Sequence, residues 1–506
     1  MMRWTWLLLA VLAASPAVAD DKKKDDKKAK EAPVAQAPVA LDAVKEAEAK
    51  LAAGDADGAI GVLEKGLGGP AAGEAGLRLG RLRESRGELD LAVDAYKAAA
   101  GKLTGAAKGE ALGRMAVVQD TRGMAEAAAS AEAAVAADPE GMWPAIALSY
   151  RRAHEGKPDE GVTLAQKALA AGGGAGAQSA LGHALEAKGD MAGAEAAYRT
   201  AMAGDAQALA PVIGLATVLR KTGRAAEAEP MLKKVIDASP GAVEAYKELA
   251  RVKITLGRAQ EALADANLAA AMAENDPEAL ELVTETKVSR ALQDLAGGQA
   301  DLAAQDLTQL RDQNPGSAAV RLGLGRAQIA RRDADGALPE LQKAVELDPK
   351  NAEAQYQLGY VYHVMKQNAA SAVGPYEKAV ALEPGNTLFR ASLGSALTDA
   401  GQLDRAVEEL TKVTGSPGYT GWQAWFSLGA AQLKANRYKE AVAALEKAIA
   451  AKPDNAQAEA FLAWSYFGLK DADGFKAHGA KARRLGYKDP QLFDRLTKVE
   501  AGQAIK

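Results

Sequence analysis

Apolar residues recur at helical spacing from Leu41 almost to the C-terminus, and no convincing stretch alternates apolar and polar positions as a half-buried strand does. Turns rich in glycine or proline divide this pattern into segments of about 13 residues, a length at which an isolated helix is marginal in water. Each helix must therefore bury its apolar stripe against its neighbours. The pattern predicts an all-α fold built from many short helices.

The turn residues recur at a nearly constant interval. In the first half of the chain the turn glycines are Gly54, Gly87, Gly123, Gly156, Gly189, Gly223 and Gly257, which are 33, 36, 33, 33, 34 and 34 residues apart. In the second half, Pro349 follows Pro315 by 34 residues, and Pro384 follows Pro349 by 35. Self-similarity at this period is typical of a helical solenoid made of stacked helix pairs.

Small side chains also recur at one place in the second helix of each predicted pair. These residues are Ala194, Ala228, Ala262, Ala303, Ala337, Ala372, Ala406 and Ala441. A methyl group lets the second helix approach the first closely, so that each pair can bury its apolar stripe against its neighbours. We therefore expect all eight alanines to be buried at contacts between helices.

A complete unit has a Leu-Gly pair in its first helix, small residues flanking an aromatic residue or leucine in its second helix, and a closing proline. The clearest copies are Leu428, Gly429, Ala441, Leu445, Ala448, Pro453 and Leu358, Gly359, Tyr362, Ala372, Tyr376, Ala379, Pro384. This combination resembles the tetratricopeptide repeat, from Leu41 to about Tyr487. The resemblance implies a right-handed superhelical solenoid of about 12 to 13 helix-turn-helix repeats, whose first helices line a concave surface that holds a peptide.

Two places depart from the period. Gly298 follows Gly257 by 41 residues, so the helix around Pro277 to Leu295 should be about two turns longer than its counterparts. We interpret this as a junction between an N-terminal array, residues 41–276, and a C-terminal array, residues 277–486. Thr414 to Gly421 form a longer loop, and residues 487–506 are predicted to be a capping helix and tail, which an open-ended stack needs for solubility.

The N-terminal residues have the pattern of an export signal. Arg3 precedes the apolar segment Trp4 to Ala14, and Ala17 to Ala19 form a small-residue cleavage site, so residues 1–19 are interpreted as a cleaved signal peptide. The apolar segment is shorter than the roughly 20 residues that span a bilayer. Residues 20–40, charged and then rich in Ala-Pro-Val, should be a solvated linker. The predicted signal peptide leads us to expect a periplasmic protein. The chain has no cysteine, which excludes disulfides and thiolate metal sites.

Features of catalysis are scarce. The four histidines fall in different units, without the spacing of a metal-binding helix, and neither a GxSxG elbow nor an SxxK pair is present. We therefore expect no enzyme, no cofactor and no metal. The formal net charge of −4 also makes nucleic acid an unfavourable ligand.

The resemblance also implies which side chains line the groove. In this sequence the groove positions of the tetratricopeptide family correspond to Tyr356, Tyr360, His363, Phe426, Trp464 and Phe467. A shift of one residue would instead place this set in the core and bring Tyr362, Trp425 and Tyr466 toward the groove. Corresponding N-terminal positions are polar and suit polar contacts; they are Glu244, Lys247, Arg251, His183 and Glu186.

The resemblance implies a non-catalytic periplasmic scaffold for protein–protein interactions in a multiprotein cell-envelope machine, such as gliding motility, pilus assembly or secretion. The expected partners are extended or helical segments of other envelope proteins. The alternative is a glycan-binding or regulatory factor in envelope polysaccharide synthesis or export, because aromatic rings such as Tyr356, Trp464 and Phe467 also stack on sugars.

Overall fold

The computed structural model describes residues 43–205, 208–273 and 276–505, and this part of the chain is helical, without strands. The signal peptide and the linker predicted for residues 1–40 lie outside the described residues. The helices are α1 (Ala43–Ala52), α2 (Ala56–Gly66), α3 (Ala72–Ser85), α4 (Leu89–Ala100), α5 (Gly105–Thr121), α6 (Ala127–Ala137), α7 (Met142–His154), α8 (Pro158–Ala170), α9 (Gly174–Lys188), α10 (Met191–Gly204), α11 (Leu209–Lys221), α12 (Ala225–Ala238), α13 (Val243–Thr255), α14 (Ala259–Met272), α15 (Pro277–Ala296), α16 (Ala300–Gln313), α17 (Ala318–Ala330), α18 (Ala334–Leu347), α19 (Ala352–Tyr360), the π-helical turn η1 (Val361–Met365), α20 (Ala369–Leu382), α21 (Thr387–Asp399), α22 (Leu403–Thr414), α23 (Trp422–Lys434), α24 (Tyr438–Ala451), α25 (Ala456–Gly468), α26 (Ala472–Arg484) and α27 (Pro490–Glu500).

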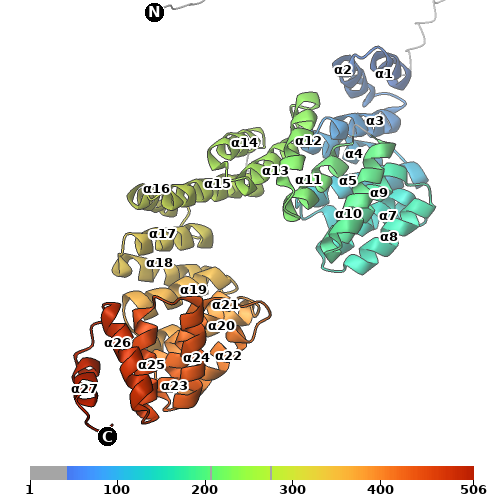
Figure 1. Ribbon diagram of the computed structural model, residues 1–506. Coiled ribbons are helices and arrows are strands. Elements are labelled where there is room, and N and C mark those ends of the chain that lie inside the picture. Colours follow the sequence, from blue (N-terminus) through green and yellow to red (C-terminus); the bar gives the residue numbers. More distant parts are fainter. Residues whose placement is uncertain (1–42, 206–207, 274–275, 506) are drawn as a thin grey trace, which may run out of the picture.

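The helices are arranged as successive pairs. Odd-numbered helices up to α25 are the first helices and even-numbered ones the second helices, so α1 to α26 make 13 pairs and α27 stands alone. The two members of a pair pack along each other, as α9 and α10 do, and first helices also pack on the first helices of neighbouring pairs, as α5 does on α7. Successive second helices lack comparable packing in the described ranges. First helices therefore lie on the inner side of a solenoid (Figure 1), as the sequence predicts.

Every pair turns at a residue in the left-handed region. Nine of these residues are glycines: Gly54, Gly87, Gly123, Gly156, Gly189, Gly223, Gly257, Gly298 and Gly401. The other four are Arg332, Gln367, Asn436 and Lys470, with φ between 52° and 62°. A left-handed residue ends a helix and satisfies its last carbonyl groups, and glycine adopts this conformation without steric cost. The period therefore continues through four pairs in which glycine is absent from the turn.

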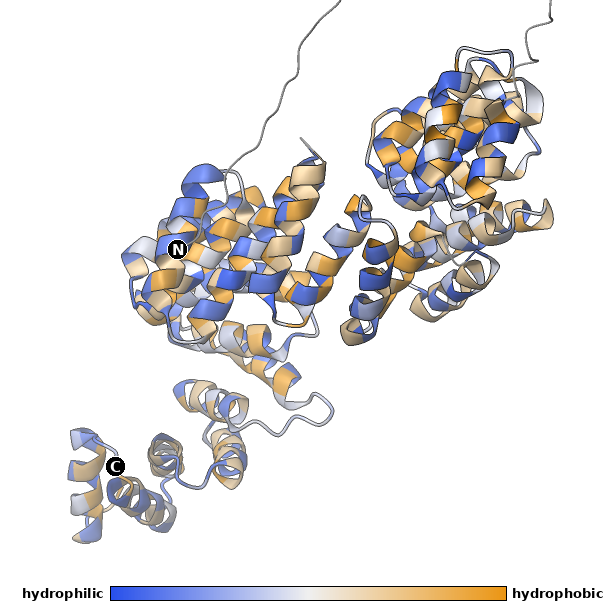
Figure 2. Cartoon of the chain, turned by 90° about the horizontal axis from the view of Figure 1, so that it is seen from above, coloured by the Kyte–Doolittle hydropathy of each residue, from blue (hydrophilic) through white to orange (hydrophobic). Residues whose placement is uncertain are grey.

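Small residues interlock the two helices of each pair. The eight alanines listed above all have 0% exposure, which confirms the prediction that they are buried. On the facing first helix a glycine leaves room for a large side chain of the second helix, and a Cβ atom there would lie 2.4 to 2.7 Å from it. These contacts are Gly80 with Tyr96, Gly182 with Tyr198, Gly325 with Leu341, Gly359 with Tyr376, Gly394 with Leu410 and Gly429 with Leu445. Figure 2 shows the result: helices carry hydrophobic and hydrophilic residues on different sides.

Enlarging one of these alanines should strain the contact. We expect Ala228→Leu to lower the free energy of unfolding by roughly 1–3 kcal/mol, because a fully buried methyl position on α12 has no space for an isobutyl group. Thermal and urea unfolding of the variant and the parent would measure the difference. A variant that unfolds like the parent would contradict this account of the packing.

The long helix predicted near residue 277 is present. Helix α15 has 20 residues, seven more than the 13 of α13 and of α17, which accounts for the 41-residue step. It begins at Asp276, whose carboxylate accepts hydrogen bonds from the backbone N–H groups of Glu278 and Ala279. Figure 1 shows α15 lying between α13 and α16. The division into two arrays at this helix stays a prediction.

The last helix covers the end of the stack. Leu492 and Leu496 of α27 have 0% exposure and pack with Phe475 of α26 in one apolar cluster. The other side of α27 is exposed and charged, as expected of a capping helix.

Within the described ranges, none of the helices combines the length and the hydropathy needed to cross a membrane.

Candidate partner-binding surface

The tenth pair contains one extra residue, and the π-helical turn η1 accommodates it. From the interlocking glycine to the turn residue is eight positions in this pair, Gly359 to Gln367, but seven in the eleventh, Gly394 to Gly401. The N–H of Lys366 donates to the carbonyl oxygen of Val361 at 2.9 Å, five residues back. Single π-turns are the usual way in which an α-helix absorbs an insertion, and they are frequent at functional sites. The same residue explains the 35-residue step between the closing prolines.

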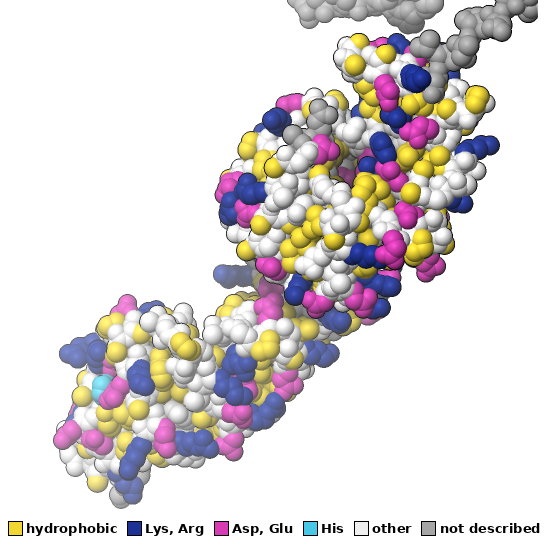
Figure 3. All heavy atoms as spheres, turned by 90° about the vertical axis from the view of Figure 1, so that its right-hand side faces the viewer, with side chains coloured by type: hydrophobic (Ala, Val, Ile, Leu, Met, Phe, Trp, Pro, Cys, Tyr) yellow, Lys and Arg dark blue, Asp and Glu magenta, His cyan; other side chains and the backbone are white. Residues whose placement is uncertain are grey.

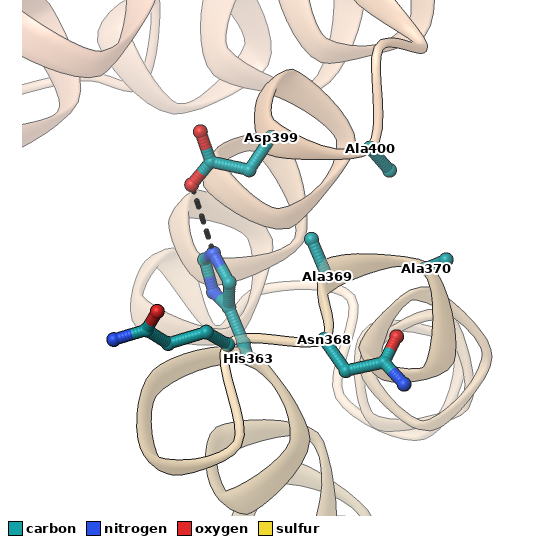
Figure 4. Close-up of a pocket in the computed structure, with 7 residues that line it drawn as sticks. His363, Asn368, Ala369, Ala370, Asp399 and Ala400 are labelled. Carbon is teal, nitrogen blue, oxygen red and sulfur yellow. Dashed lines mark hydrogen bonds and ion pairs between the residues drawn. The ribbon is translucent and has the colours of Figure 1, made fainter.

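A cavity of about 730 Å³ lies beside this turn. Its lining residues come from η1, the following turn, the start of α20 and the end of α21: His363, Gln367, Asn368, Ala369, Ala370, Asp399 and Ala400 (Figure 4). The side chain of Asn368 accepts a hydrogen bond from the N–H of Ser371 and so caps α20. The cavity therefore sits where two successive pairs meet, with polar groups along its wall.

Asp399 joins three successive first helices. One carboxylate oxygen, Oδ2, lies 3.1 Å from Nε2 of His363, and the other, Oδ1, accepts a hydrogen bond from Nζ of Lys434 at 2.9 Å. Burial disfavours the charge of Asp399, but the hydrogen bonds from Lys434 and His363 outweigh it and hold the pKa of the carboxyl below its usual value. The wall of the cavity thus keeps a negative charge with two cationic or hydrogen-bonding neighbours.

The predicted groove residues of the tenth pair, Tyr356, Tyr360 and His363, are half-buried. The ring of Tyr356 stacks on Phe389 at 4.8 Å between centroids and lies 5.7 Å from Tyr376, so it takes part in packing between pairs. Tyr360 and His363 are also half-buried, and the next residue, Val364, is 51% exposed. Residues three and four positions apart lie on one side of a helix. Tyr360, His363 and Val364, which we call the η1 surface, therefore form an accessible mixed surface beside the cavity.

The other predicted groove residues pack against two apolar clusters that share Phe461. Phe426 lies 5.2 Å from the ring of Phe461. Trp464 lies 5.6 Å from the ring of Phe467, and its Nε1 donates to Asp489 Oδ2 at 3.2 Å. Trp464 and Phe467 thus pack with the C-terminal segment.

The residues of the alternative register are half-buried too. Tyr362 accepts a hydrogen bond from Nε2 of Gln342, Lys447 lies over the ring of Trp425 at 4.1 Å, and Tyr466 stacks on His478. Exposure therefore does not separate the two registers.

The N-terminal positions expected to offer a polar surface are largely used inside the chain. Lys247 has an exposure of only 1%, and its Nζ lies 2.9 Å from Glu244 Oε1 and 3.3 Å from Asp276 Oδ2. Burial raises the pKa of Glu244 despite the charge of Lys247. Glu186 pairs with Lys221 at 2.7 Å. These side chains are committed to intrachain contacts, because the first helices approach too closely to leave them in solvent.

His183 should make the protein sensitive to acid. Burial, together with nearby His154, lowers the pKa of His183 to about 4 in the folded chain, whereas an unfolded histidine titrates near 6.5. The unfolded state therefore binds the proton first, and stability is lost as the pH falls from about 6.5 toward 4. We expect this loss to be about 2–3 kcal/mol smaller in His183→Gln. Urea unfolding of both proteins at pH 7 and pH 4 measures it, and equal losses would contradict the assignment.

The charge distribution gives no dominant sign to the surface seen in Figure 3. Lysine and arginine side chains alternate with aspartate and glutamate, and hydrophobic side chains lie between them. Such a surface suits contacts with other proteins better than it suits a polyanion, whose binding needs a concentrated positive patch.

Comparison with known proteins agrees with the geometry of a helical repeat solenoid. Two family models, both described as tetratricopeptide repeat, match this chain, one at residues 392–456 and 431–486 and the other at 219–285 and 294–356. These matches identify tetratricopeptide repeats at residues 219–285, 294–356 and 392–486.

Two curated relatives match parts of the chain. Tetratricopeptide repeat protein 37 of Xenopus laevis is 30% identical over 125 residues, 24% of this chain and 8% of the relative. The small glutamine-rich tetratricopeptide repeat-containing protein 2 of Mycosarcoma maydis is 29% identical over 114 residues, 22% of this chain and 32% of the relative. The chain therefore spans less than a third of the length of either relative.

Solved structures with similar helices include the Cut9–Hcn1 hetero-tetramer, with a TM-score of 0.41, 13% identity and coverage of 90% of this chain and 95% of that one. The pilus biogenesis factor PilW has a TM-score of 0.37 and 16% identity, with 42% of this chain and 98% of that one covered. YrrB, described as a tetratricopeptide repeat protein with an unusual peptide-binding site, has a TM-score of 0.34 and 22% identity, with 38% and 99% covered.

Proposed function

We propose that this protein is a non-catalytic scaffold that binds segments of partner proteins on the η1 surface and in the adjoining cavity. The observation that carries the proposal is the exposed side chain of Val364 beside half-buried Tyr360 and His363, next to a cavity of about 730 Å³. Apolar and aromatic groups that are accessible but held rigidly by the fold are typical anchors of protein interfaces.

The chemistry of the surface favours a peptide segment of mixed character. An apolar side chain of the partner would pack on Val364 and the ring of Tyr360. Amide or basic groups next to it would meet the carboxylate of Asp399 and the side-chain amide of Gln367 in the cavity. The cavity volume lies within the usual range of ligand sites, roughly 300–1,000 Å³.

The place of action is part of the same proposal. We propose that the chain is exported to the periplasm and holds together components of a cell-envelope machine, such as those of gliding motility, pilus assembly or secretion. Support comes from the residues at the N-terminus, where Arg3 and an apolar segment precede Ala17-Val18-Ala19. Cell fractionation and the intact mass of the purified protein test this: a periplasmic species that begins at Asp20 is expected, and an unprocessed cytoplasmic one would contradict it.

The binding surface is tested by a charge placed on it. We expect Val364→Asp to reduce the yield of partners crosslinked in the native cell envelope by about tenfold or more, because a carboxylate would be desolvated at the interface. The matched control is Leu302→Asp on the second helix α16, where the leucine is 43% exposed but lies away from the η1 surface. Quantitative mass spectrometry of the crosslinked proteins compares both variants with the parent.

Equal yields for Val364→Asp and the parent would refute the proposed surface. A glycan ligand is distinguished by titration with envelope oligosaccharides, followed by intrinsic fluorescence. Saturable quenching that is lost in Tyr360→Ala, without loss of crosslinked proteins, would replace the protein-binding proposal by the glycan-binding one.

A further inference from the structure

Two edges of the N-terminal helices meet although they are far apart in the sequence. The turn between α3 and α4 lies against the loop between α12 and α13. The hydroxyl of Ser239 donates a hydrogen bond to the carbonyl oxygen of Ser85 at 3.4 Å, across 154 residues. A Cβ atom on Gly87 would lie 2.5 Å from Cα of Ala242, a residue with 1% exposure. The two backbones are therefore in close contact.

This contact sets Gly87 apart from the other turn glycines. The eight remaining ones, Gly54, Gly123, Gly156, Gly189, Gly223, Gly257, Gly298 and Gly401, have open space where a Cβ atom would be, with no atom within 4 Å. Their common need is the left-handed conformation. Gly87 has that conformation, with φ of 73°, and in addition gives room to the loop that begins α13.

Ion pairs join the same two edges. Arg122, just after α5, places Nη1 3.0 Å from Asp276 Oδ2 and 3.4 Å from Glu244 Oε1, across 154 and 122 residues. The side chain of Arg122 is 11% exposed and that of Asp276 is 6% exposed. Lys247 contacts both carboxylates from the other side. One arginine of the third pair therefore holds the starts of α13 and α15.

We call this junction the seam: it consists of Ser85 and Gly87 against Ser239 and Ala242, and of Arg122 against Glu244 and Asp276. Its contacts differ from those between neighbouring pairs. Neighbouring pairs are held by buried apolar clusters, such as the one formed by Leu215, Leu219, Leu232 and Leu249. The seam instead consists of a backbone contact and charged groups. Bulk salt screens exposed ion pairs strongly but buried pairs such as these much less, so deleting one charged partner is the sharper perturbation. In a solenoid, small rotations at successive interfaces can separate distant pairs while each pair stays folded.

We infer that this seam is an electrostatic latch: the ion pairs of Arg122 with Asp276 and Glu244 hold α3 to α15 as a closed turn, and their loss opens it. Opening exposes carboxylates and the amine of Lys247, which the closed form keeps from solvent. The latch therefore sets when the inner side of the N-terminal helices is accessible to a partner.

Distances between two spin labels on the full-length chain test the inference. The chain has no cysteine, so labelled cysteines at Glu132 on α6 and Glu281 on α15 are unique, and both positions are exposed. At low salt we expect one narrow distance distribution for the parent. Arg122→Ala should add a population at longer distance, whereas 1 M NaCl with the parent should have a smaller effect, because buried ion pairs are screened much less than exposed ones. A label pair at Glu132 and Lys157, within neighbouring pairs, should not change.

Two matched variants separate the latch from general damage. Arg331 occupies the same place before its turn as Arg122 but pairs only one repeat away, with Asp301 at 2.7 Å, so Arg331→Ala should leave the distances unchanged. Gly87→Ala should wedge the seam open, whereas Gly223→Ala carries the same backbone strain in open space and should not. Circular dichroism shows whether each variant keeps its helices.

The outcomes are decisive in both directions. Longer distances in folded Arg122→Ala, with unchanged controls, support the latch. Unchanged distances in folded Arg122→Ala at every salt concentration overturn it, and so does opening by Gly87→Ala alone, because the seam would then be held by packing and not by charge. A parent with long distances already at low salt would also overturn it.

Discussion

Replacing Tyr376 by alanine is expected to lower the free energy of unfolding by about 3–5 kcal/mol, the range found when a buried ring is deleted from a core. Tyr376 is 1% exposed and fills the space over Gly359, where a Cβ atom would lie 2.6 Å from the ring. Its ring also supports Tyr356 at 5.7 Å and His363 at 6.2 Å. The cavity left by alanine would loosen both the pair and the η1 surface.

The chain itself offers the control for this substitution. Leu341, Leu410 and Leu445 occupy the position of Tyr376 in other pairs, each over a glycine. Tyr376→Leu should therefore cost less than Tyr376→Ala, because leucine leaves a smaller cavity than alanine does. Urea unfolding with hydrogen exchange of α19 and α20 measures both variants. If the alanine and leucine variants unfold alike, the ring does not fill the space that we assign to it.

The second large effect is expected at Lys247. Its removal in Lys247→Ala leaves Glu244 and Asp276 buried with Arg122 as their remaining shared cation. Breaking a buried ion pair by deleting one partner typically costs about 3–5 kcal/mol, because the other charge stays desolvated. Since solenoids unfold locally, the loss should appear as faster hydrogen exchange in α13 and at the start of α15, and as a lower urea midpoint.

An exposed lysine provides the comparison. Lys233 is 54% exposed and pairs with Glu229 on the same helix at 2.7 Å. Lys233→Ala should change stability by less than about 0.5 kcal/mol, as such surface pairs do. If Lys247→Ala were equally mild, the charged cluster would have to be hydrated, contrary to the exposure of 1%.

The repeating part of the fold could be predicted because it depends on the regular spacing of small residues and turn residues along the sequence. Alanines such as Ala228 and Ala406 are small for one reason in every pair, so their period indicates the stack directly. The lengthened α15 was also visible, because seven extra residues have no other place in a helical array. These features depend on neighbouring segments only.

Other features depend on geometry that spacing does not encode. Arg332 and Lys470 adopt the left-handed conformation although their residue type disfavours it, so glycine counting misses their turns. The extra residue between Pro349 and Pro384 is visible in the sequence, but its absorption in η1 and not in a loop is not. The contact of Gly87 with Ala242 results from small rotations summed over several pairs.

The candidate site was predicted less completely than the fold. Tyr360 and His363 lie beside the cavity, whereas Tyr356 packs on Phe389 and Trp464 packs with residues after α26. Asp399 and Lys434 are not among the predicted groove residues. Each nevertheless lies five positions after an interlocking glycine, Asp399 after Gly394 and Lys434 after Gly429. Opposite charges at the same position of successive first helices are a sequence signal that could indicate this wall of the cavity.

The interlock between glycine and a large side chain has a consequence for how such a chain can change over generations. Because Gly394 with Leu410 and Gly429 with Leu445 make the same contact 35 residues apart, a whole unit can be duplicated or lost between them without creating a new kind of boundary. Gene rearrangement can therefore change the length of the solenoid in steps of one helix pair, while the two ends keep their own specialised surfaces.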